Sequence, residues 1–197
     1  SALLKNPGSN IHTLYLFNIN IPDPEVEDSL DGIDDECISI ISNALIQNRT
    51  LRSLSLSCSV LSATGWNTLS SFLSHHTCSL EILLLGGCRL GDEGITSLGE
   101  ALTVNKSLKC LDLGSFDSIT LAACQELSKC LRTSTSALEE LFLEYRNMND
   151  EKILVFIEAL AGNASFKKLQ VKGYGVTDGV LKVLSRLLCD KACIDGT

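Results

Sequence analysis

The feature that most constrains this chain is a short phrase of apolar residues that occurs six times. Each copy has an aliphatic or aromatic residue, a leucine three positions later, and a leucine or valine two positions after that. The copies begin at Ile11, Leu51, Leu80, Leu108, Leu138 and Phe166, so successive starts lie 40, 29, 28, 30 and 28 residues apart. A period of this length predicts a repeat solenoid, in which each unit buries its apolar side against the next.

Within one period the pattern changes from that of a strand to that of a helix. Residues 82–85 alternate about a two-residue period, which predicts a short strand. After Gly91, the apolar residues Ile95, Leu98 and Leu102 fall on one face of a helix. Strand–helix units in series require parallel strands joined by helical crossovers. We therefore expect an α/β fold, a curved right-handed solenoid with six parallel strands on its concave face and helices on its convex face.

The third copy extends into a longer pattern with Leu80, Leu83, Leu85, Cys88, Leu90, Gly94, Leu98 and Leu102. In this pattern the whole chain resembles leucine-rich repeat proteins of the long, ribonuclease-inhibitor-like type. At the position of Cys88 the other copies have Ile19, Ser59, Phe116, Arg146 and Tyr174, so the subfamily is not assigned. The resemblance implies a protein-binding array, as in ribonuclease inhibitor, the sensor arms of nucleotide-binding immune receptors and Ran-type GTPase-activating proteins.

The unbroken repeats predict a single leucine-rich repeat domain over residues 1–197. The segment Ala2–Asn6 matches the predicted helix end Ala44–Asn48, and neither end of the chain has a polar capping element. Solenoids need such caps. We therefore expect a fragment of a longer array, with self-association of the uncapped ends as the alternative.

The net charge of −8 has one source, an acidic insert at residues 22–36. The insert holds eight acids and no Lys or Arg, and the rest of the chain holds sixteen residues of each sign. Because there is no basic stripe, nucleic acid is not an expected partner. No apolar stretch is long enough to predict a membrane span. The spacing of the acids does not match a calcium-binding loop, so we interpret the insert as a solvated loop.

The nine cysteines follow the repeat phase rather than a disulfide framework. This favours reduced thiols and a cytoplasmic, intracellular protein. Three sequons, at Asn48, Asn105 and Asn163, would accept glycans in a secreted protein. All three stand just before a predicted strand, where an asparagine followed by a hydroxyl residue is ordinary turn chemistry. We therefore interpret them as turn residues.

The candidate binding surface is the concave sheet, where the residues between the core leucines should face solvent. These are Thr13, Tyr15, Phe17; Ser53, Ser55, Ser57; Ile82, Leu84, Gly86; Cys110, Asp112, Gly114; Glu140, Phe142, Glu144; and Lys168, Gln170, Lys172. Exposed aromatic residues on a rigid surface anchor protein interfaces. The partner-binding patch is therefore predicted to consist of Tyr15, Phe17, Ile82, Leu84, Phe142 and Tyr145. The alternative is that aromatic residues simply suit strands.

Charged residues of the last two copies stand at identical phases. The predicted cross-strand pairs are Glu139 with Lys167, Glu140 with Lys168, and Glu144 with Lys172. Because such charges satisfy each other, we interpret them as structural contacts rather than as a recognition site.

Catalytic residues are not evident in the sequence. His75, His76 and Cys78 lie in a predicted turn, and no further ligands are placed to complete a zinc site. No Gly-rich phosphate loop follows a strand, and no nucleophile stands beside a histidine and an acid. The sequence therefore predicts a protein that is not an enzyme and that needs no metal or cofactor.

The expected function is protein–protein interaction, with the partner on the concave face and the strand-exit loops. Two alternatives remain. One is a regulatory accessory of the GTPase-activating, inhibitor or sensor type, for which Arg89 and Arg146 would be the candidate groups. The other is a purely structural spacer.

Overall fold

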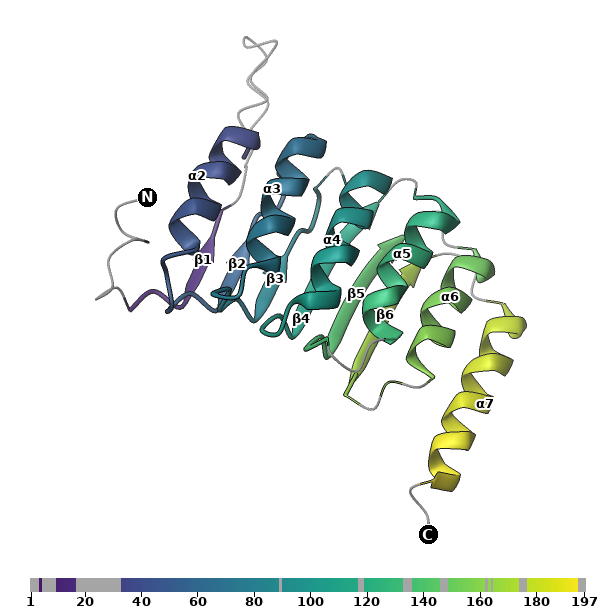
Figure 1. Ribbon diagram of the computed structural model, residues 1–197. Coiled ribbons are helices and arrows are strands. Elements are labelled where there is room, and N and C mark those ends of the chain that lie inside the picture. The colour runs from purple at the N-terminus through teal and green to yellow at the C-terminus, as the bar shows by residue number, and fades with distance from the viewer. Residues whose placement is uncertain are drawn as a thin grey trace.

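The protein is described here by a computed structural model, which places six strand–helix units side by side (Figure 1). The structure describes residues 4, 10–16, 33–88, 90–116, 119–132, 136–145, 149–161, 163, 165–173 and 177–194. The strands are β1 (Thr13–Tyr15), β2 (Ser53–Ser55), β3 (Ile82–Leu84), β4 (Cys110–Phe116), β5 (Glu140–Tyr145) and β6 (Lys168–Gly173). The helices are α2 (Asp35–Leu45), α3 (Ala63–Ser74), α4 (Asp92–Val104), α5 (Leu121–Arg132), α6 (Asp150–Leu160) and α7 (Asp178–Ile194).

The six strands form one parallel sheet in the order β1-β2-β3-β4-β5-β6. In every neighbouring pair of strands the middle leucine of one repeated phrase lies beside that of the next, and the register shifts only between β4 and β5, after Asp112. In β2 to β5 these leucines (Leu54, Leu83, Leu111, Leu141) are 0% exposed. The predicted α/β fold of six parallel strands is confirmed, and the repeat period is its cause.

The helices cover one face of the sheet and leave the other face open (Figure 1). We call this second face the open face; it is the concave surface of the sequence prediction. Between the helices, Trp66 of α3 is 2% exposed and packs where α4 has a glycine. A Cβ atom on Gly94 would lie 2.9 Å from Cδ1 of Trp66, so the absence of a side chain lets the two helices approach.

The three sequon asparagines lie in the turns that lead from a helix to the next strand, as predicted. Asn105 is 4% exposed; its Nδ2 donates to the carbonyl of Leu73 at 2.6 Å, and its Oδ1 accepts from the backbone N–H of Ser107 and Leu108 at 2.9 and 2.7 Å. Asn48 and Asn163 make the same three kinds of contact. Each amide thus joins a turn to the preceding repeat, and its nitrogen is buried and engaged.

A second contact between repeats recurs at the start of the helices. The carboxylate of Asp92 accepts from the backbone N–H of Thr120 at 2.8 Å and from its hydroxyl at 2.6 Å. The pairs Asp35 with Ser62 and Asp150 with Thr177 repeat this arrangement. Because the hydroxyl residue precedes a helix in each pair, the carboxylate of one repeat orders the beginning of the next helix.

Most of the acidic insert lies outside the described residues. Its last three acids begin α2: the side chain of Asp34 accepts from the backbone N–H of Cys37 at 2.8 Å and caps the helix, and Asp35 and Glu36 occupy the first turn. This hydrogen bond lowers the pKa of Asp34. Acids at a helix N-terminus are stabilised by the helix dipole, which gives this part of the insert a structural role.

Candidate functional site

The open face is built from the strand residues that alternate with the buried leucines. The pairing register places these residues in two rows across the sheet. The first row is Thr13, Ser53, Ile82, Cys110, Glu140 and Lys168, and the second is Tyr15, Ser55, Leu84, Asp112, Phe142 and Gln170. The leucines of β2 to β5 are in the buried core, and Leu14 of β1 and Leu169 of β6 pack against it, so the rows form one continuous surface.

Four of the six predicted contact residues are described with their side chains, and all four lie in these rows. Tyr15 is 56% exposed and Ile82 is 37% exposed. Leu84 and Phe142 are half-buried. Phe17 lies outside the described residues, and the side chain of Tyr145 does as well. The binding role of all six stays a prediction.

The structure divides the predicted patch into two parts. Leu84 pairs with Asp112, and Asp112 pairs with Phe142, so a carboxylate stands between the two apolar side chains. The ammonium of Lys168 lies 4.6 Å from the centroid of the Phe142 ring. We call Tyr15 of β1 and Ile82 and Leu84 of β3, which flank the short serines of β2, the apolar group, and Phe142 is a separate residue beneath a cation.

Two serines expected to face solvent are in fact buried. Ser53 is 8% exposed and Ser55 is 1% exposed. They pair with Thr13 and Tyr15 on one side and with Ile82 and Leu84 on the other, so larger neighbours enclose their short side chains. The hydroxyl oxygens of Ser55 and Ser57 lie 3.0 Å apart. The prediction that Ser53 and Ser55 face solvent was wrong. The short side chains of β2 lie below the larger side chains of β1 and β3.

The predicted charge pairs behave in different ways. Lys167 and Glu139 form an ion pair at 2.7 Å, as expected. Glu140 and Lys168 are adjacent in register, but the Lys168 ammonium contacts the Phe142 ring and forms no ion pair with Glu140 in the described contacts. Glu144 and Lys172 are also in register, and the side chain of Lys172 lies outside the described residues.

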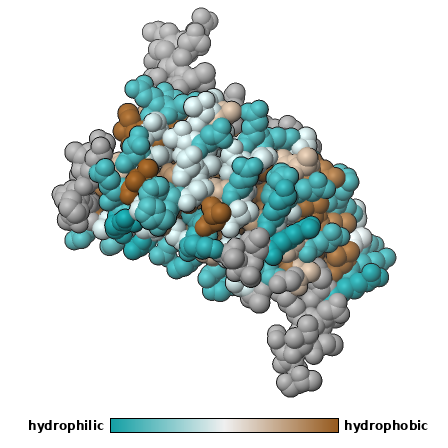
Figure 2. All heavy atoms as spheres, viewed as in Figure 1, coloured by the Kyte–Doolittle hydropathy of each residue, from teal (hydrophilic) through white to brown (hydrophobic). Residues whose placement is uncertain are grey.

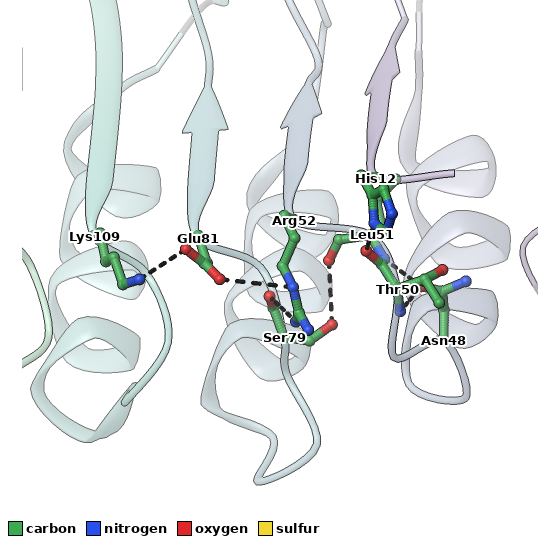
Figure 3. A network of polar contacts seen from close by, with 8 residues as sticks. All are labelled: His12, Asn48, Thr50, Leu51, Arg52, Ser79, Glu81 and Lys109. Carbon is green, nitrogen blue, oxygen red and sulfur yellow. Dashed lines mark hydrogen bonds and ion pairs between the residues drawn. The ribbon is translucent and has the colours of Figure 1, made fainter. Parts of the chain in front are cut away.

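The ion pairs extend further along the sheet than the sequence reasoning found. The residue just before each of the strands β2 to β6 carries a charge of alternating sign, and we call these residues the charge row: Arg52, Glu81, Lys109, Glu139 and Lys167. Glu81 lies 3.6 Å from the Nε atom of Arg52 and 2.8 Å from the Nζ atom of Lys109 (Figure 3). The hydrogen bond from Lys109 lowers the pKa of Glu81, and the same bond raises that of Lys109. The signal was available, because all five residues stand at one phase of the repeat.

Hydrogen bonds surround the charge row (Figure 3). Arg52 donates from Nη1 to the carbonyl of Ser79 at 2.9 Å, and Ser79 donates from its hydroxyl to the carbonyl of Leu51 at 3.2 Å. The ring Nδ1 of His12 lies 2.9 Å from the carbonyl oxygen of Thr50. These groups bind to one another across neighbouring repeats. The polar residues at the amino-terminal ends of the strands therefore have a structural role.

Nucleophilic or metal-binding chemistry has little support in the described part of the chain. Burial raises the pKa of Cys88, Cys110 and Cys124 to about 11 and that of Cys130 to about 12, so these thiols stay protonated at neutral pH. No group of three or more potential metal ligands occurs among the described residues. The Nδ1 atom of His75 lies 2.8 Å from the Thr77 hydroxyl, which fits its predicted place in a turn.

Two other predictions concern the GTPase-activating alternative and membrane insertion. Arg89 and Arg146, the candidate groups of a GTPase-activating protein, lie outside the described residues. Within the described part of the chain, no helix combines the length and the apolar character that a membrane crossing requires.

Comparison with known proteins agrees with this architecture. A sequence profile of the family described as Leucine Rich repeat matches residues 47–66 and 76–99. NACHT, LRR and PYD domains-containing protein 5 of Mus musculus is 28% identical over 190 residues, which cover 96% of this chain and 15% of that protein. Protein 12 of the same series, also from Mus musculus, is 31% identical over 141 residues, which cover 72% of this chain and 12% of that protein. The chain thus spans a small part of these relatives.

A solved structure shows the same fold. The tropomodulin C-terminal domain of Caenorhabditis elegans superposes with a TM-score of 0.61 at 15% identity, over 77% of this chain and 90% of that chain. The repeat family and the relatives support a protein-interaction or regulatory role. With its recurring leucines in register across six parallel strands and its family match, the chain is a leucine-rich repeat protein whose subfamily is left unassigned.

Proposed function

We propose that this chain is a protein-interaction module that holds a partner protein on the open face of its sheet. The observation behind the proposal is the exposure of large apolar side chains, chiefly Tyr15 and Ile82, on strands of one sheet that packs against the buried core. Burying such side chains drives association, and a preorganised surface lowers the entropy lost on binding.

The helix side offers a weaker surface. Seen from that side, the molecule is largely hydrophilic. Hydrophobic residues are scattered over it and are more frequent toward α6 and α7 (Figure 2). Its exposed large apolar residues include Ile40 on α2, Val104 on α4 and Leu181 on α7, which belong to helices that are not neighbours. Single exposed apolar residues are normal on soluble proteins, whereas those of the open face share one surface.

The proposal is tested with a Tyr15→Asp, Leu84→Asp, Phe142→Asp triple variant in affinity capture from the native cell extract. The matched control is an Ile40→Asp, Val104→Asp, Leu181→Asp variant, which adds the same three charges on the helix side. We expect a protein that is retained by the wild type and by the control and lost by the triple variant. Circular dichroism verifies that both variants fold. Equal capture by all three proteins would contradict the proposal.

A further inference from the structure

Acidic side chains stand beside the apolar residues of the open face, and they bear on the chemistry of the partner that this face binds. We infer that the open face recognises a basic segment of a partner protein, in which a lysine or arginine lies next to an apolar anchor. This inference rests on the proposed function, because it specifies the chemistry of the same surface.

The geometry places apolar and acidic side chains next to each other. In one row Ile82, Cys110 and Glu140 follow on successive strands, and in the other Leu84 pairs directly with Asp112. Neighbouring strands lie about 4.8 Å apart, so Leu84 and Asp112 are one spacing apart and Ile82 and Glu140 are about 10 Å apart. The apolar group thus passes directly into an acidic one.

The carboxylates of Asp112 and Glu140 differ from those of the charge row, which already have partners. Glu81 and Glu139 are neutralised within the charge row. Asp112 accepts from the backbone N–H of Gly114 at 2.8 Å through one oxygen, and no cation contacts it among the described residues. Glu140 is likewise without an ion pair in the described contacts. Lys168 is the nearest described cation in register, and its ammonium lies over the Phe142 ring.

The two carboxylates also affect the pKa of a neighbouring thiol. Cys110 lies between Ile82 and Glu140 and is half-buried. Burial is the main cause that raises the pKa of its thiol, and the charges of Glu140 and Asp112 raise it further, while Lys168 acts in the opposite direction. The protonated thiol is therefore a small apolar surface between the aliphatic side chains and the carboxylates.

The side chains of lysine and arginine fit this arrangement of an apolar surface next to carboxylates. Their methylene stems pack on apolar surface while the charged head reaches a polar group. A stem lying on Leu84 and Cys110 would direct its head to Asp112 and Glu140. An extended chain rises about 3.3 Å per residue, so the apolar anchor and the cation would be two or three residues apart. An acidic segment would meet like charge at the same place and be rejected.

The test uses a phage-displayed library of random 12-residue peptides selected on the protein, with the strongest peptide then synthesised and its affinity measured by fluorescence anisotropy. The decisive variant is Asp112→Asn with Glu140→Gln, which removes both charges and keeps the side-chain shapes. The control is Glu100→Gln with Glu158→Gln, which makes the same change of net charge at exposed positions of α4 and α6. A further variant, Leu84→Asp, reports on the apolar anchor.

We expect the selected peptides to have a lysine or arginine within three residues of an apolar residue. We also expect at least a tenfold loss of affinity in the Asp112, Glu140 variant, no change in the control, and weaker binding at high salt. Neutral or acidic peptides, an unchanged affinity in that variant, or a selection without binders would overturn the inference. Peptides that bind the charge variant as tightly as the wild type but bind the Leu84→Asp variant weakly would overturn this inference and still support the proposed function. Peptides unaffected by both would contradict the proposed function as well.

Discussion

Odd and even repeats of this array have the same backbone but different polar residues at the same positions. Counting each strand with the helix that follows it, the odd repeats begin their helices with Asp35, Asp92 and Asp150, and the turns after these helices hold Asn48, Asn105 and Asn163. The even repeats have Ser62, Thr120 and Thr177 before their helices. At the position of the asparagines, the first even helix is followed by Thr77.

The difference shows that the polar contacts between repeats join an odd repeat to an even one. Each odd carboxylate accepts from the hydroxyl residue of the next even repeat, and Asn105 and Asn163 donate back to the even helix before them. The charge row alternates in the same sense, with Glu81 and Glu139 in odd repeats and basic residues in even ones. The structural unit is therefore a pair of repeats, in agreement with the 57 and 58 residues that separate the three asparagines.

The largest expected effect separates the two kinds of helix-to-strand turn. Asn105→Ala would leave a carbonyl and two backbone N–H groups without partners, and we expect it to lower the free energy of unfolding by roughly 3 kcal/mol. The Thr77 hydroxyl donates to the carbonyl of Ile46 at 2.9 Å and lies 2.8 Å from Nδ1 of His75, so Thr77→Ala would leave only one backbone group without its partner and should cost about 1 kcal/mol. Urea unfolding of both variants measures the difference, and equal losses would show that odd and even turns are equivalent.

A smaller effect is expected where the helices begin. Asp92→Ala removes two hydrogen bonds to Thr120 and should cost about 1 kcal/mol. The control is Asp178→Ala, which also removes an acid from the first residue of a helix, although no described residue donates to Asp178. If the contact between repeats matters, Asp92→Ala is the more harmful change in thermal unfolding. Equal shifts in Tm would assign the whole effect to the helix dipole.

The smallest effect concerns the charge row. The pKa of Glu81 lies below 4.5 because Lys109 donates to it, so the pair stabilises the folded state above that pH, and this contribution is lost as the pH falls through the folded-state pKa. Glu81→Gln should therefore lower Tm slightly at neutral pH and progressively less as the pH falls through the folded-state pKa of Glu81 into the acidic range. Both groups are exposed, so high salt should also reduce the difference. A loss of Tm that is equal at neutral and acidic pH would argue for a packing effect of Glu81 instead.

The fold could be predicted from the sequence because buried leucines at a fixed spacing leave few alternatives. Leu54, Leu83 and Leu111 stand at one phase of the repeated phrase, and parallel strands in register follow from that phase. The turn role of the sequon asparagines was also predictable, since their position before each strand is a local property. Short-range spacing thus determined both the sheet and its turns.

The candidate site was predicted less completely, because the phase of a residue gives its direction but not its surroundings. Ser55 points to the open face and is still buried, since Tyr15 and Leu84 stand on both sides of it. Lys168 stands beside Glu140 in register, but its flexible side chain places the ammonium over Phe142. The alternation of odd and even repeats is not evident from the apolar phrase, because its period is two repeats and it involves only polar residues.

The place of Trp66 has a practical consequence. It is the only tryptophan in the chain, and it is buried where α3 meets the glycine of α4. Its fluorescence therefore reports on one junction between neighbouring repeats, whereas circular dichroism averages over all helices. Repeat arrays lose cooperativity when one junction weakens. Coincident midpoints from the two spectroscopic signals would show that the whole array melts as one body, and an earlier tryptophan signal would identify this junction as the first to open.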